Sequence, residues 1–268
     1  MYLFEAEIIE KWQLAADIFR LRLRAGEEFI AAGRPGRFVM LAPVGGLYDP
    51  LLRRPFGIVR CGDGWFEVVI KAVGKGSRNL VGLPAGAGIT VHGPLGNGWP
   101  QDESGEQPLI LVAGGIGIAA IAPVIFARRA ESETFLLYGA ATKDELVLLD
   151  EFTTHDGRGP QIEVITDDGS CGRRGLVTEL LLEKLEEYPG ARVFACGPEP
   201  MLKGVQKVLR ERDIEGWEGW LSLENRMACG FGVCLGCVQK TGSEPETKTS
   251  KVCTEGPVFA AGEVIFDD

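Results

Sequence analysis

Histidine is scarce in this sequence, and no apolar run is long. Only two histidines, His92 and His155, occur among 268 residues, and no nucleophile stands in a recognisable pairing with either. Both are therefore expected to be structural or exposed, and no catalytic residue is assigned. The N-terminal residues alternate and carry charges, unlike a secretory leader, and no stretch reaches the length of a membrane span. The sequence predicts a cytoplasmic protein with no membrane association.

A basic surface is lacking as well. The 28 Lys and Arg residues are outnumbered by 38 Asp and Glu residues, which gives a formal net charge of −10. Nucleic-acid binding depends on a basic stripe, so we expect no nucleic-acid partner. The charge is uneven, because the first 100 residues are slightly basic and the remainder is acidic. A basic first part suits an anionic cofactor, and an acidic remainder suits a protein partner.

Cysteine, by contrast, is concentrated near the C-terminus, where four of the seven cysteines follow a C-x4-C-x2-C-x15-C pattern. These four are Cys229, Cys234, Cys237 and Cys253. The spacing is that of plant-type [2Fe–2S] proteins, in which four thiolates complete the coordination of two irons. The glycines between them allow the loop to wrap closely and to aim backbone N–H groups at the sulfurs. The sequence therefore predicts a [2Fe–2S] cluster held by these cysteines.

Three other interpretations of the cysteines are weaker. A Zn(Cys)4 site normally uses two close C-x2-C pairs, and only Cys234 and Cys237 form one here. Disulfides are disfavoured by the odd total of seven and by the lack of a leader. A thioredoxin-like C-x-x-C follows a strand and opens a helix, whereas this pair stands among glycines. The iron–sulfur interpretation is favoured, with zinc as the main alternative.

Periodicity divides the chain into three units. Residues 1–101 consist of short strand-like runs separated by glycine turns, which predicts an antiparallel β-barrel. Residues 102–215 alternate apolar runs with helix-like stretches, which predicts an α/β unit with a five-stranded parallel sheet. The runs are Leu109–Ala113, Phe135–Tyr138, Ile162–Thr166, Arg192–Cys196 and Trp220–Leu223, and helices are expected over Ile116–Ala130, Lys143–Phe152, Leu176–Glu187 and Pro200–Arg212. Residues 216–268 form the small cysteine-bearing unit, which the cluster is expected to stabilise.

A glycine turn after the first of these runs has the form of a phosphate-binding loop. Gly114 precedes a G-x-G-x-x-A pattern made by Gly115, Gly117 and Ala120, between a strand and a helix. The second run ends in Tyr138 and small residues, without the acid that a dinucleotide fingerprint places there. The turn is therefore expected to hold a nicotinamide nucleotide loosely. Tight strand–helix packing alone is the alternative explanation.

Three further segments are candidates for ligand contact. Cys196-Gly197-Pro198 follows the fourth run, at the sheet edge where open α/β sheets bind ligands. Arg54-Pro55-Phe56-Gly57 combines a guanidinium that suits a pyrophosphate with an aromatic ring that suits a ring system. Val73–Ser77 is a second small-residue turn. The plainer explanations are a buried cysteine before a proline-started helix, a charged strand end and an ordinary glycine turn.

The order of these motifs resembles the ferredoxin reductase family. The chain contains R-P-F-G, K-x-x-G-x-G-S, G-P-L-G, A-G-G-I-G and C-G-P, followed by the four-cysteine tail. More narrowly, L-R-R-P, G-P-L-G-N-G, T-D-D-G-S, E-N-R-M-A-C-G and V-C-x-x-G-P-V-F are similar to the electron-transfer subunits of NAD-dependent (class 1B) dihydroorotate dehydrogenases. The similarity covers essentially the whole chain, and E-N-R-M-A-C-G is its most specific segment.

This resemblance implies an FAD-binding barrel, a nicotinamide-binding α/β unit and a C-terminal [2Fe–2S] unit. FAD would contact Arg54, Pro55, Phe56, Gly57, Ile70, Lys71, Gly76 and Ser77. The nicotinamide nucleotide would lie beside Gly114, Gly115, Gly117, Cys196, Gly197 and Pro198, and the cluster would lie on the four cysteines. One position departs from the family pattern, because Gly57 stands where a serine is usual. The hydroxyl that would hydrogen-bond the flavin is missing there.

The resemblance also implies a function in electron transfer. Nicotinamide carries electrons in pairs, an iron–sulfur cluster carries them singly, and a flavin handles both. The expected partner is an FMN-containing dihydroorotate dehydrogenase catalytic subunit, in a hetero-oligomer of pyrimidine biosynthesis. The alternatives are a reductase module serving a hydrogenase, an oxygenase or a ferredoxin, and a non-redox protein with structural zinc. Asp167 and Asp168, after the third run, would repel a 2′-phosphate and favour NAD over NADP.

Overall fold

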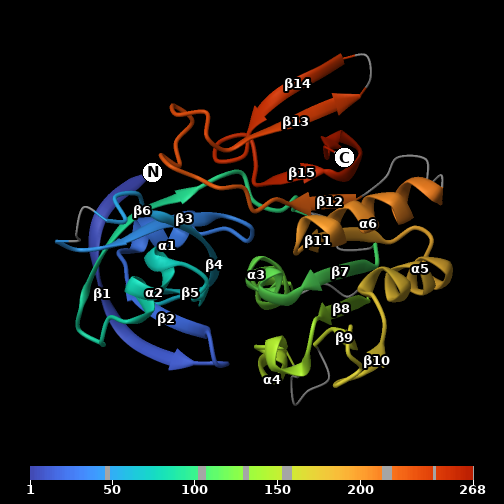
Figure 1. Ribbon diagram of the computed structural model, residues 1–268, viewed down its shortest axis with the longest axis horizontal. Coiled ribbons are helices and arrows are strands. Elements are labelled where there is room, and N and C mark those ends of the chain that lie inside the picture. The colour runs from blue at the N-terminus through green and yellow to red at the C-terminus, as the bar shows by residue number, and fades with distance from the viewer. Residues whose placement is uncertain are drawn as a thin grey trace.

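Three units of the chain pack against one another in the computed structural model (Figure 1). The structure describes residues 1–45, 49–101, 107–128, 133–152, 159–212, 219–243 and 246–267. The boundaries predicted from the sequence fall at residue 102 and at residues 215 and 216, which lie outside the described residues. His155 lies outside them as well. A barrel and an α/β unit stand next to each other, and the cysteine-bearing C-terminal segment lies across both (Figure 1).

The first unit is a closed antiparallel barrel, which confirms the prediction from its short strand-like runs. Alternate residues of each strand point inward, so large apolar side chains such as Phe66 and Ile70 are fully buried. The strands, in barrel order, are β1 (Tyr2–Gln13), β2 (Ile18–Arg24), β5 (Trp65–Lys71), β4 (Arg54–Gly62), β3 (Phe38–Pro43) and β6 (Gly88–Leu95). Two short helices not expected from the sequence, α1 (Glu27–Ala32) and α2 (Lys75–Val81), lie in its connections.

The second unit is a sheet in which the five expected strands run parallel. In spatial order they are β9 (Gln161–Thr166), β8 (Thr134–Ala140), β7 (Leu109–Gly114), β11 (Arg192–Cys196) and β12 (Gly219–Ser222). Two strands not expected from the sequence extend it to seven: β10 (Arg173–Arg174) beside β9, and β15 (Val258–Ala260), which runs antiparallel to β12. Helices α3 (Ile118–Ala127) and α4 (Leu149–Phe152) cover the face toward the barrel, and α5 (Val177–Glu187) and α6 (Glu199–Glu211) cover the other face (Figure 1). The strand–helix alternation thus predicted the layers correctly.

One predicted helix is wrong. In place of a helix over Lys143–Phe152, the chain forms a 3₁₀ turn, η2 (Lys143–Glu145), and the four-residue α4. The helix cannot run through because Leu148 has a φ of 68°, in the left-handed region. The Val147 N–H also donates to the Tyr138 hydroxyl at 3.2 Å. The expected helix over Ile116–Ala130 is η1 (Gly115–Gly117) followed by α3, and residues 129 and 130 lie outside the described residues.

The third unit is small and shares its core with its neighbours. Strand β13 (Val238–Ser243) pairs with β14 (Glu246–Lys251) and with β16 (Val264–Ile265), which follows the 3₁₀ turn η3 (Ala261–Glu263). Cys237 and Cys253 belong to one apolar cluster with Met40 and Leu95 of the barrel and with strands of the parallel sheet. The cysteine-bearing segment is therefore anchored on both larger units. Within the described ranges, no helix is long and apolar enough to cross a membrane.

Candidate functional site

The predicted nucleotide turn and the Cys196 loop meet at one edge of the sheet. Strands β7 and β11 are parallel neighbours, so Gly114 and Cys196 come together at their C-terminal ends. A Cβ built on Gly117 would lie 2.3 Å from the carbonyl oxygen of Cys196, and one on Gly114 would lie 3.0 Å from Cδ of Pro198. A Cβ on Gly197 would lie 3.0 Å from Cα of Gly114. The backbones of the two loops therefore touch each other before α3. A glycine turn at the N-terminus of a helix presents backbone N–H groups that can bind a phosphate.

Arg54 and α2 bring together one group of the residues expected to contact a flavin. The Arg54 side chain lies over α2, where a Cβ on Gly76 would be 2.8 Å from its Nε. The Ser77 hydroxyl is held in the same turn, because it donates to the Gly74 carbonyl at 3.0 Å and accepts from the Gly74 N–H at 3.1 Å. Among the described residues, the neighbouring Arg53 has a buried Nε without an acceptor. A bound anion would satisfy such a donor, so this end of the barrel fits a cofactor that carries phosphate.

Gly57 lies further along β4 and faces the α/β unit. A Cβ on Gly57 would lie 3.7 Å from the carbonyl oxygen of Ala119 in α3, which is an ordinary contact distance. Pro55 and Phe56, the preceding residues of β4, are half-buried. A serine would therefore fit at position 57, and glycine is not required there by space. The departure from the family pattern removes a hydroxyl without reshaping the site.

Ile70 and Lys71 end strand β5 in different surroundings. The Ile70 side chain is fully buried in the barrel, so its backbone is the part available to a cofactor. Lys71 Nζ lies 2.6 Å from Glu145 Oε1. The other oxygen of that carboxylate is 3.5 Å from the position of a Cβ on Gly115. This ion pair brings the expected flavin group to the nucleotide turn.

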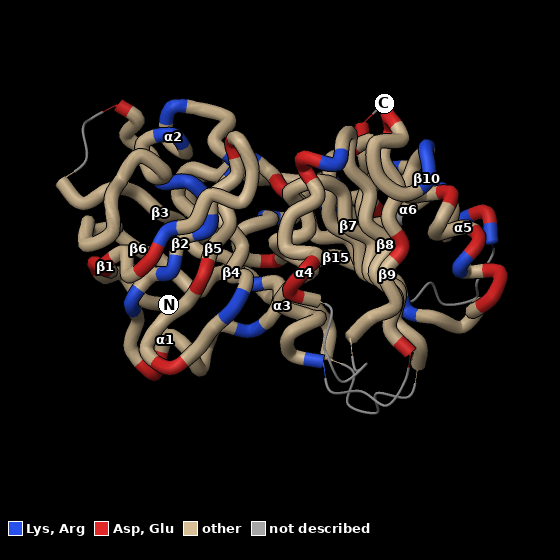
Figure 2. Tube along the Cα trace, turned by 90° about the horizontal axis from the view of Figure 1, so that it is seen from below, with Lys and Arg blue, Asp and Glu red and all other residues tan. Residues whose placement is uncertain are grey.

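The seam between the barrel and the α/β unit is crossed by further ion pairs. Arg20 Nη1 lies 2.5 Å from one oxygen of Glu151, and Arg60 Nη2 lies 3.0 Å from the other. Figure 2 shows basic positions on the barrel strands and acidic positions at α4, on the two sides of this seam. Together with the Lys71 pair, they place cations on the barrel and carboxylates on the α/β unit.

The four cysteines lie in two contacting pairs. Cys229 interacts with Cys234, and Cys253 interacts with Cys237. Burial opposes ionisation of Cys229, but the backbone N–H groups of Phe231, Val233 and Cys234 and the Cys234 thiol point at its sulfur and lower its pKa from 9.0 to about 6. Burial and the neighbouring Cys237 raise the pKa of Cys253 to about 12. The loop therefore stabilises the thiolate form of Cys229. At Cys253, the charge of the neighbouring Cys237 opposes ionisation.

This arrangement fits a cationic centre of two metal ions. In the described part of the chain, no three Cys, His, Asp or Glu side chains converge closely enough to hold one ion. The two pairs of thiolates would instead hold a centre of two irons, whose positive charge would relieve the repulsion between the sulfurs. Further donors face the sulfurs: the Gly236 N–H lies 3.4 Å from Cys234 Sγ, and the Gly232 N–H points at Cys253. Such donors stabilise ligating thiolates.

An acid–thiol pair beside the nucleotide loops was not expected from the sequence. The Sγ of Cys196 lies 3.9 Å from Oε1 of Glu224, which follows β12. Burial raises the pKa of Glu224, and burial together with the Glu224 charge raises the pKa of Cys196. Glu224 is an exposed residue by its solvent-accessible surface, although its carboxyl lies against the Cys196 thiol. The available signal was its position as the first residue of the E-N-R-M-A-C-G segment.

Two family models match the chain. Residues 224–265 match the iron–sulfur cluster binding domain of dihydroorotate dehydrogenase B, and residues 111–207 match the oxidoreductase NAD-binding domain. A protein of Thermococcus kodakarensis, named probable dihydroorotate dehydrogenase B (NAD(+)), electron transfer subunit, is 36% identical over 264 residues, 96% of each chain. An Aquifex aeolicus homolog of that subunit is 33% identical over 264 residues, 97% of this chain and 98% of its own. The chain belongs to this family of electron transfer subunits.

Solved structures share the fold of this chain. A chain of the NADH-dependent reduced ferredoxin-NADP oxidoreductase, studied for flavin-based electron bifurcation, is 30% identical with a TM-score of 0.80, over 97% of this chain and 89% of its own. A ferredoxin NADP+ reductase of Neisseria gonorrhoeae with bound FAD and NADP shares the fold at 16% identity and a TM-score of 0.66, over 79% and 92%. The resemblance and the fold class are thus confirmed, and iron–sulfur is favoured over zinc. The individual contact residues stay predictions.

Proposed function

We propose that this electron transfer subunit carries electrons between NAD and an FMN-containing dihydroorotate dehydrogenase catalytic subunit, with which it forms a hetero-oligomer in pyrimidine biosynthesis. Its cofactors are FAD and a [2Fe–2S] cluster, and NAD is its substrate. When bound, the flavin exchanges electron pairs with nicotinamide and single electrons with the cluster. Dihydroorotate oxidation requires the partner. All seven cysteines are free thiols, which suits the reducing cytoplasm.

One observation carries this proposal: the nucleotide turn and the cysteine loop both pack on the same barrel. Gly57 of β4 faces Ala119 at the start of α3, directly after the nucleotide turn. Gly230, next to Cys229, has a φ of 81°, and a Cβ on it would lie 2.7 Å from Met40 Cγ in β3. The barrel therefore contacts both the two-electron end and the one-electron end. Units at residues 1–101, 102–215 and 216–268 are proposed to hold flavin, nucleotide and cluster in that order.

The chain's own residues then have distinct roles. Arg53 and Arg54 bind the cofactor's phosphates as fixed cations, and the glycine turn after β7 receives the phosphates of the nucleotide. The Glu224 carboxyl, whose pKa burial raises, lies next to the Cys196 loop and can exchange a proton there. The ion pairs across the seam fix the orientation of the α/β unit relative to the barrel. A nicotinamide ring at the edge of the sheet would then face the barrel.

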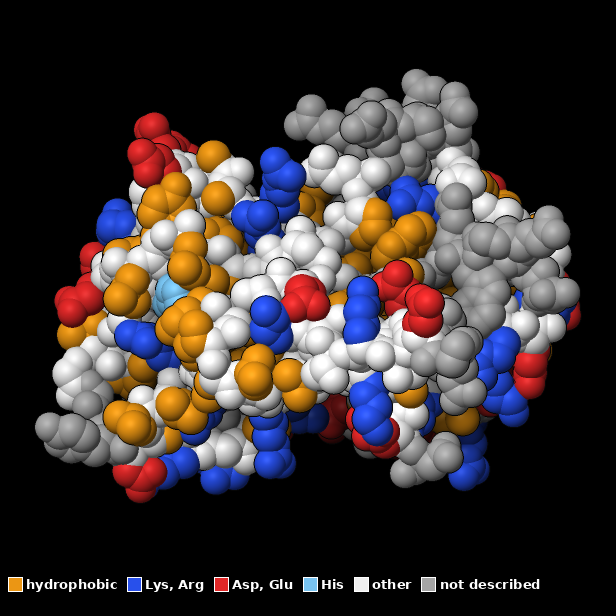
Figure 3. Space-filling view, turned by 90° about the horizontal axis from the view of Figure 1, so that it is seen from above, with side chains coloured by type: hydrophobic (Ala, Val, Ile, Leu, Met, Phe, Trp, Pro, Cys, Tyr) orange, Lys and Arg blue, Asp and Glu red, His pale blue; other side chains and the backbone are white. Residues whose placement is uncertain are grey.

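The partner is proposed to dock over the cysteine loop. Phe231, Val233 and Leu235 are exposed by 45%, 67% and 61%, and Cys234 between them is exposed as well. Phe231 packs edge-on against His92, and Leu3 stands beside His92 in the barrel. Figure 3 shows apolar side chains gathered around this histidine on the face that carries the cysteine loop. An apolar patch around a redox loop suits a protein partner.

Mixing the chain with its FMN-containing partner tests this function. We expect dihydroorotate to reduce NAD⁺ only when both subunits are present, and NADH to bleach the flavin and cluster absorbance of this subunit alone. In a Val233→Asp variant, NADH should still bleach the absorbance. The coupled activity should fall at least about tenfold, because the substitution places a charge in the exposed apolar patch around the cysteine loop. Lys207→Asp, on the exposed face of α6, is the matched control and should behave as the unsubstituted chain. Failure of dihydroorotate to reduce the mixture would contradict the proposed partner.

Nucleotide preference provides a separate prediction. Asp167 and Asp168 are exposed directly after β9, and Ser170 hydrogen bonds lower the pKa of Asp168, which keeps it charged. We expect NADH to reduce the flavin at least about tenfold more efficiently than NADPH, since a 2′-phosphate would meet this charge. An Asp168→Ser variant should have a lower KM for NADPH, which would reduce the difference in efficiency between NADH and NADPH. Equal rates with both nucleotides in the unsubstituted chain would contradict the prediction.

A second candidate function keeps the same internal route but changes the partner. The likeness to a chain of the NADH-dependent reduced ferredoxin-NADP oxidoreductase favours it. In that case reduced ferredoxin would bleach the cluster without any dihydroorotate dehydrogenase. Presenting the two electron donors separately to the same preparation distinguishes the candidates.

A further inference from the structure

The linker between the barrel and the α/β unit touches all three units. It contains Gly96, Asn97 and Trp99, from the G-P-L-G-N-G motif and the residue after it. The Trp99 N–H donates to the Pro35 carbonyl of the barrel at 3.0 Å, and its indole Nε1 donates to the Ala120 carbonyl of α3 at 2.8 Å. The Trp99 ring also stacks on Phe194 of β11, with centroids 4.8 Å apart. Trp99 thus fixes the linker on both larger units.

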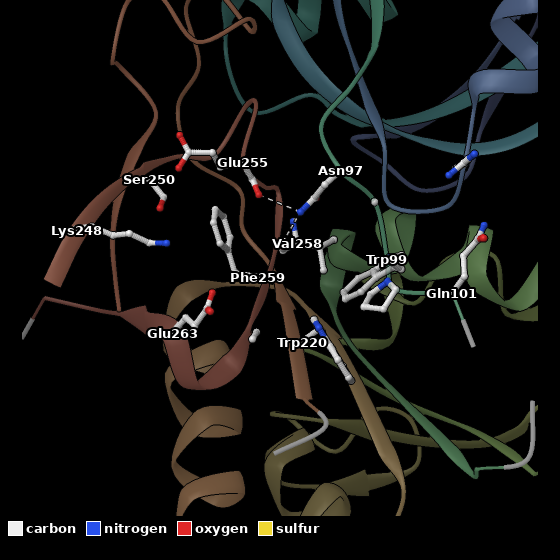
Figure 4. A pocket seen from close by; sticks show the side chains of 14 residues that line it. Asn97, Trp99, Gln101, Trp220, Lys248, Ser250, Glu255, Val258, Phe259 and Glu263 are labelled. Carbon is white, nitrogen blue, oxygen red and sulfur yellow. Dashed lines mark hydrogen bonds between the residues drawn. The ribbon is translucent and has the colours of Figure 1, made fainter. Parts of the chain in front are cut away.

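Asn97 joins this fixed linker to the cysteine-bearing segment. Its side-chain Nδ2 donates to the carbonyl of Glu255 at 3.0 Å and to that of Val258 at 2.8 Å. Its Oδ1 accepts from the Val258 N–H at 3.3 Å, and its backbone N–H donates to the Gly256 carbonyl at 2.8 Å. Figure 4 shows the side chain aimed from the linker at the two carbonyls. Asn97 therefore makes hydrogen bonds to Glu255, Gly256 and Val258. This segment begins two positions after Cys253.

The segment after Cys253 is held by β12 on one side, where the Leu223 N–H donates to the Pro257 carbonyl at 2.9 Å, and by Asn97 and Gly96 on the linker side. A pocket of about 620 Å³ opens between the linker and β14, with Lys248 and Phe259 on its far wall. The Asn97 side chain crosses beside this pocket (Figure 4). Gly96 adds a close backbone approach, since a Cβ on it would lie 2.5 Å from Cδ of Pro257. The segment after Cys253 is therefore tied to the linker mainly by hydrogen bonds.

Burial does not explain this set of hydrogen bonds. Asn97 is exposed, and water can satisfy the amide of an exposed asparagine at little cost. Its hydrogen bonds to backbone carbonyls 158 and 161 positions away along the chain instead fix the position of that distant segment. The position that it fixes is that of Cys253 relative to the barrel, to which the linker is attached.

We propose that Asn97 is a positioning residue for electron transfer: it sets the placement of the Cys253 segment relative to the barrel, and through it the separation of cluster and flavin. This inference rests on the proposed function. Asn97 touches neither the nucleotide turn nor the expected flavin contacts. Its loss should leave reduction of the flavin by NADH intact and slow the following transfer to the cluster.

Asn97→Asp is the sharpest test, because it keeps the shape and the acceptor and removes both donors. In the complete cofactor-loaded chain, stopped-flow absorbance should show flavin reduction by NADH unchanged within twofold and cluster reduction slowed about tenfold or more. Hydrogen exchange in residues 255–259 should rise about tenfold, because two lost hydrogen bonds favour local opening. Iron and FAD contents should stay unchanged. Gln101→Ala, which removes another exposed amide on the wall of the same pocket, is the matched control and should alter neither rate nor exchange.

The outcomes separate the inference from the function on which it rests. Unchanged cluster reduction and unchanged exchange in Asn97→Asp would overturn the inference alone, whereas no cluster reduction in the unsubstituted chain would overturn the proposed function. If Asn97→Asp fails to retain iron, Asn97→Ser, which keeps one short donor, should show an intermediate slowing with the cluster present. Iron loss in both variants, with normal transfer in the loaded fraction, would assign Asn97 a purely structural role and overturn the inference.

Discussion

Replacing Cys234 with alanine should remove both irons from the subunit while NADH still reduces its flavin. Cys234 is exposed, so its sulfur contributes little to core packing, and the change acts through ligation. The remaining three thiols would be too few to hold the two irons, and the Cys229 thiolate, which backbone N–H groups stabilise, would lose its neighbouring ligand. We expect bound iron to fall at least about tenfold and coupled activity with the partner to disappear. Metal analysis and the visible spectrum of an anaerobic preparation measure the first effect.

Cys171→Ala provides the control for Cys234→Ala. Cys171 is a free, partly exposed thiol between β9 and β10, outside the two contacting pairs. This variant should keep its iron, its spectrum and its coupled activity. Full iron retention in Cys234→Ala, or iron loss in Cys171→Ala, would show that the ligand assignment is wrong. Zinc in place of iron in the unsubstituted chain would reinstate the structural-zinc interpretation.

Replacing Gly117 with alanine should nearly abolish the use of NADH. The added methyl carbon would lie 2.3 Å from the carbonyl oxygen of Cys196 and 2.6 Å from its carbon, and both are backbone atoms. The turn and the Cys196 loop must therefore move apart, which displaces the nucleotide from its reacting position. We expect the apparent KM for NADH to rise about 100-fold, as misplacement by about 1 Å commonly does to efficiency. The free energy of unfolding should fall by about 1–3 kcal/mol from overpacking.

A surface glycine separates this effect from a general response to alanine. A Cβ on Gly190, in the loop before β11, meets no atom within 4 Å, so Gly190→Ala should leave the KM for NADH unchanged. Chemical reduction by dithionite should still bleach flavin and cluster in Gly117→Ala, because those cofactors lie elsewhere. Steady-state kinetics with NADH would contradict the prediction if both variants gave the same KM.

Local patterns predicted those features of this subunit that neighbouring residues encode together. The four cysteines lie within 25 residues, and their spacing alone indicated the ligand set. The glycine turn after β7 and the Cys196 loop each follow an apolar run, so parallel pairing was enough to bring them to one edge. The strand-like runs of the first 100 residues indicated a barrel for the same reason.

Contacts between distant residues could not be predicted in this way. The Lys71–Glu145 pair joins residues 74 positions apart, and the Cys196–Glu224 pair spans 28. Periodicity carries no information about either pair, because each depends on how whole units pack. The same holds for Lys143–Phe152, whose helical pattern was overridden by the Tyr138 hydroxyl and by the backbone at Leu148. Strand β10 has two residues, too few for any period to appear.

The distribution of charge across the seam has a consequence for assembly in the cell. The crossing cations Arg20, Arg60 and Lys71 all belong to the barrel, which is synthesised first, and the carboxylates of Glu145 and Glu151 follow later. The barrel therefore carries its seam cations, of which Arg20 also lies 3.9 Å from Glu67 of the barrel, before their carboxylate partners in the α/β unit are made. These ion pairs can form only once the α/β unit has been synthesised, so the contact between the two units is completed after the barrel strands have been made.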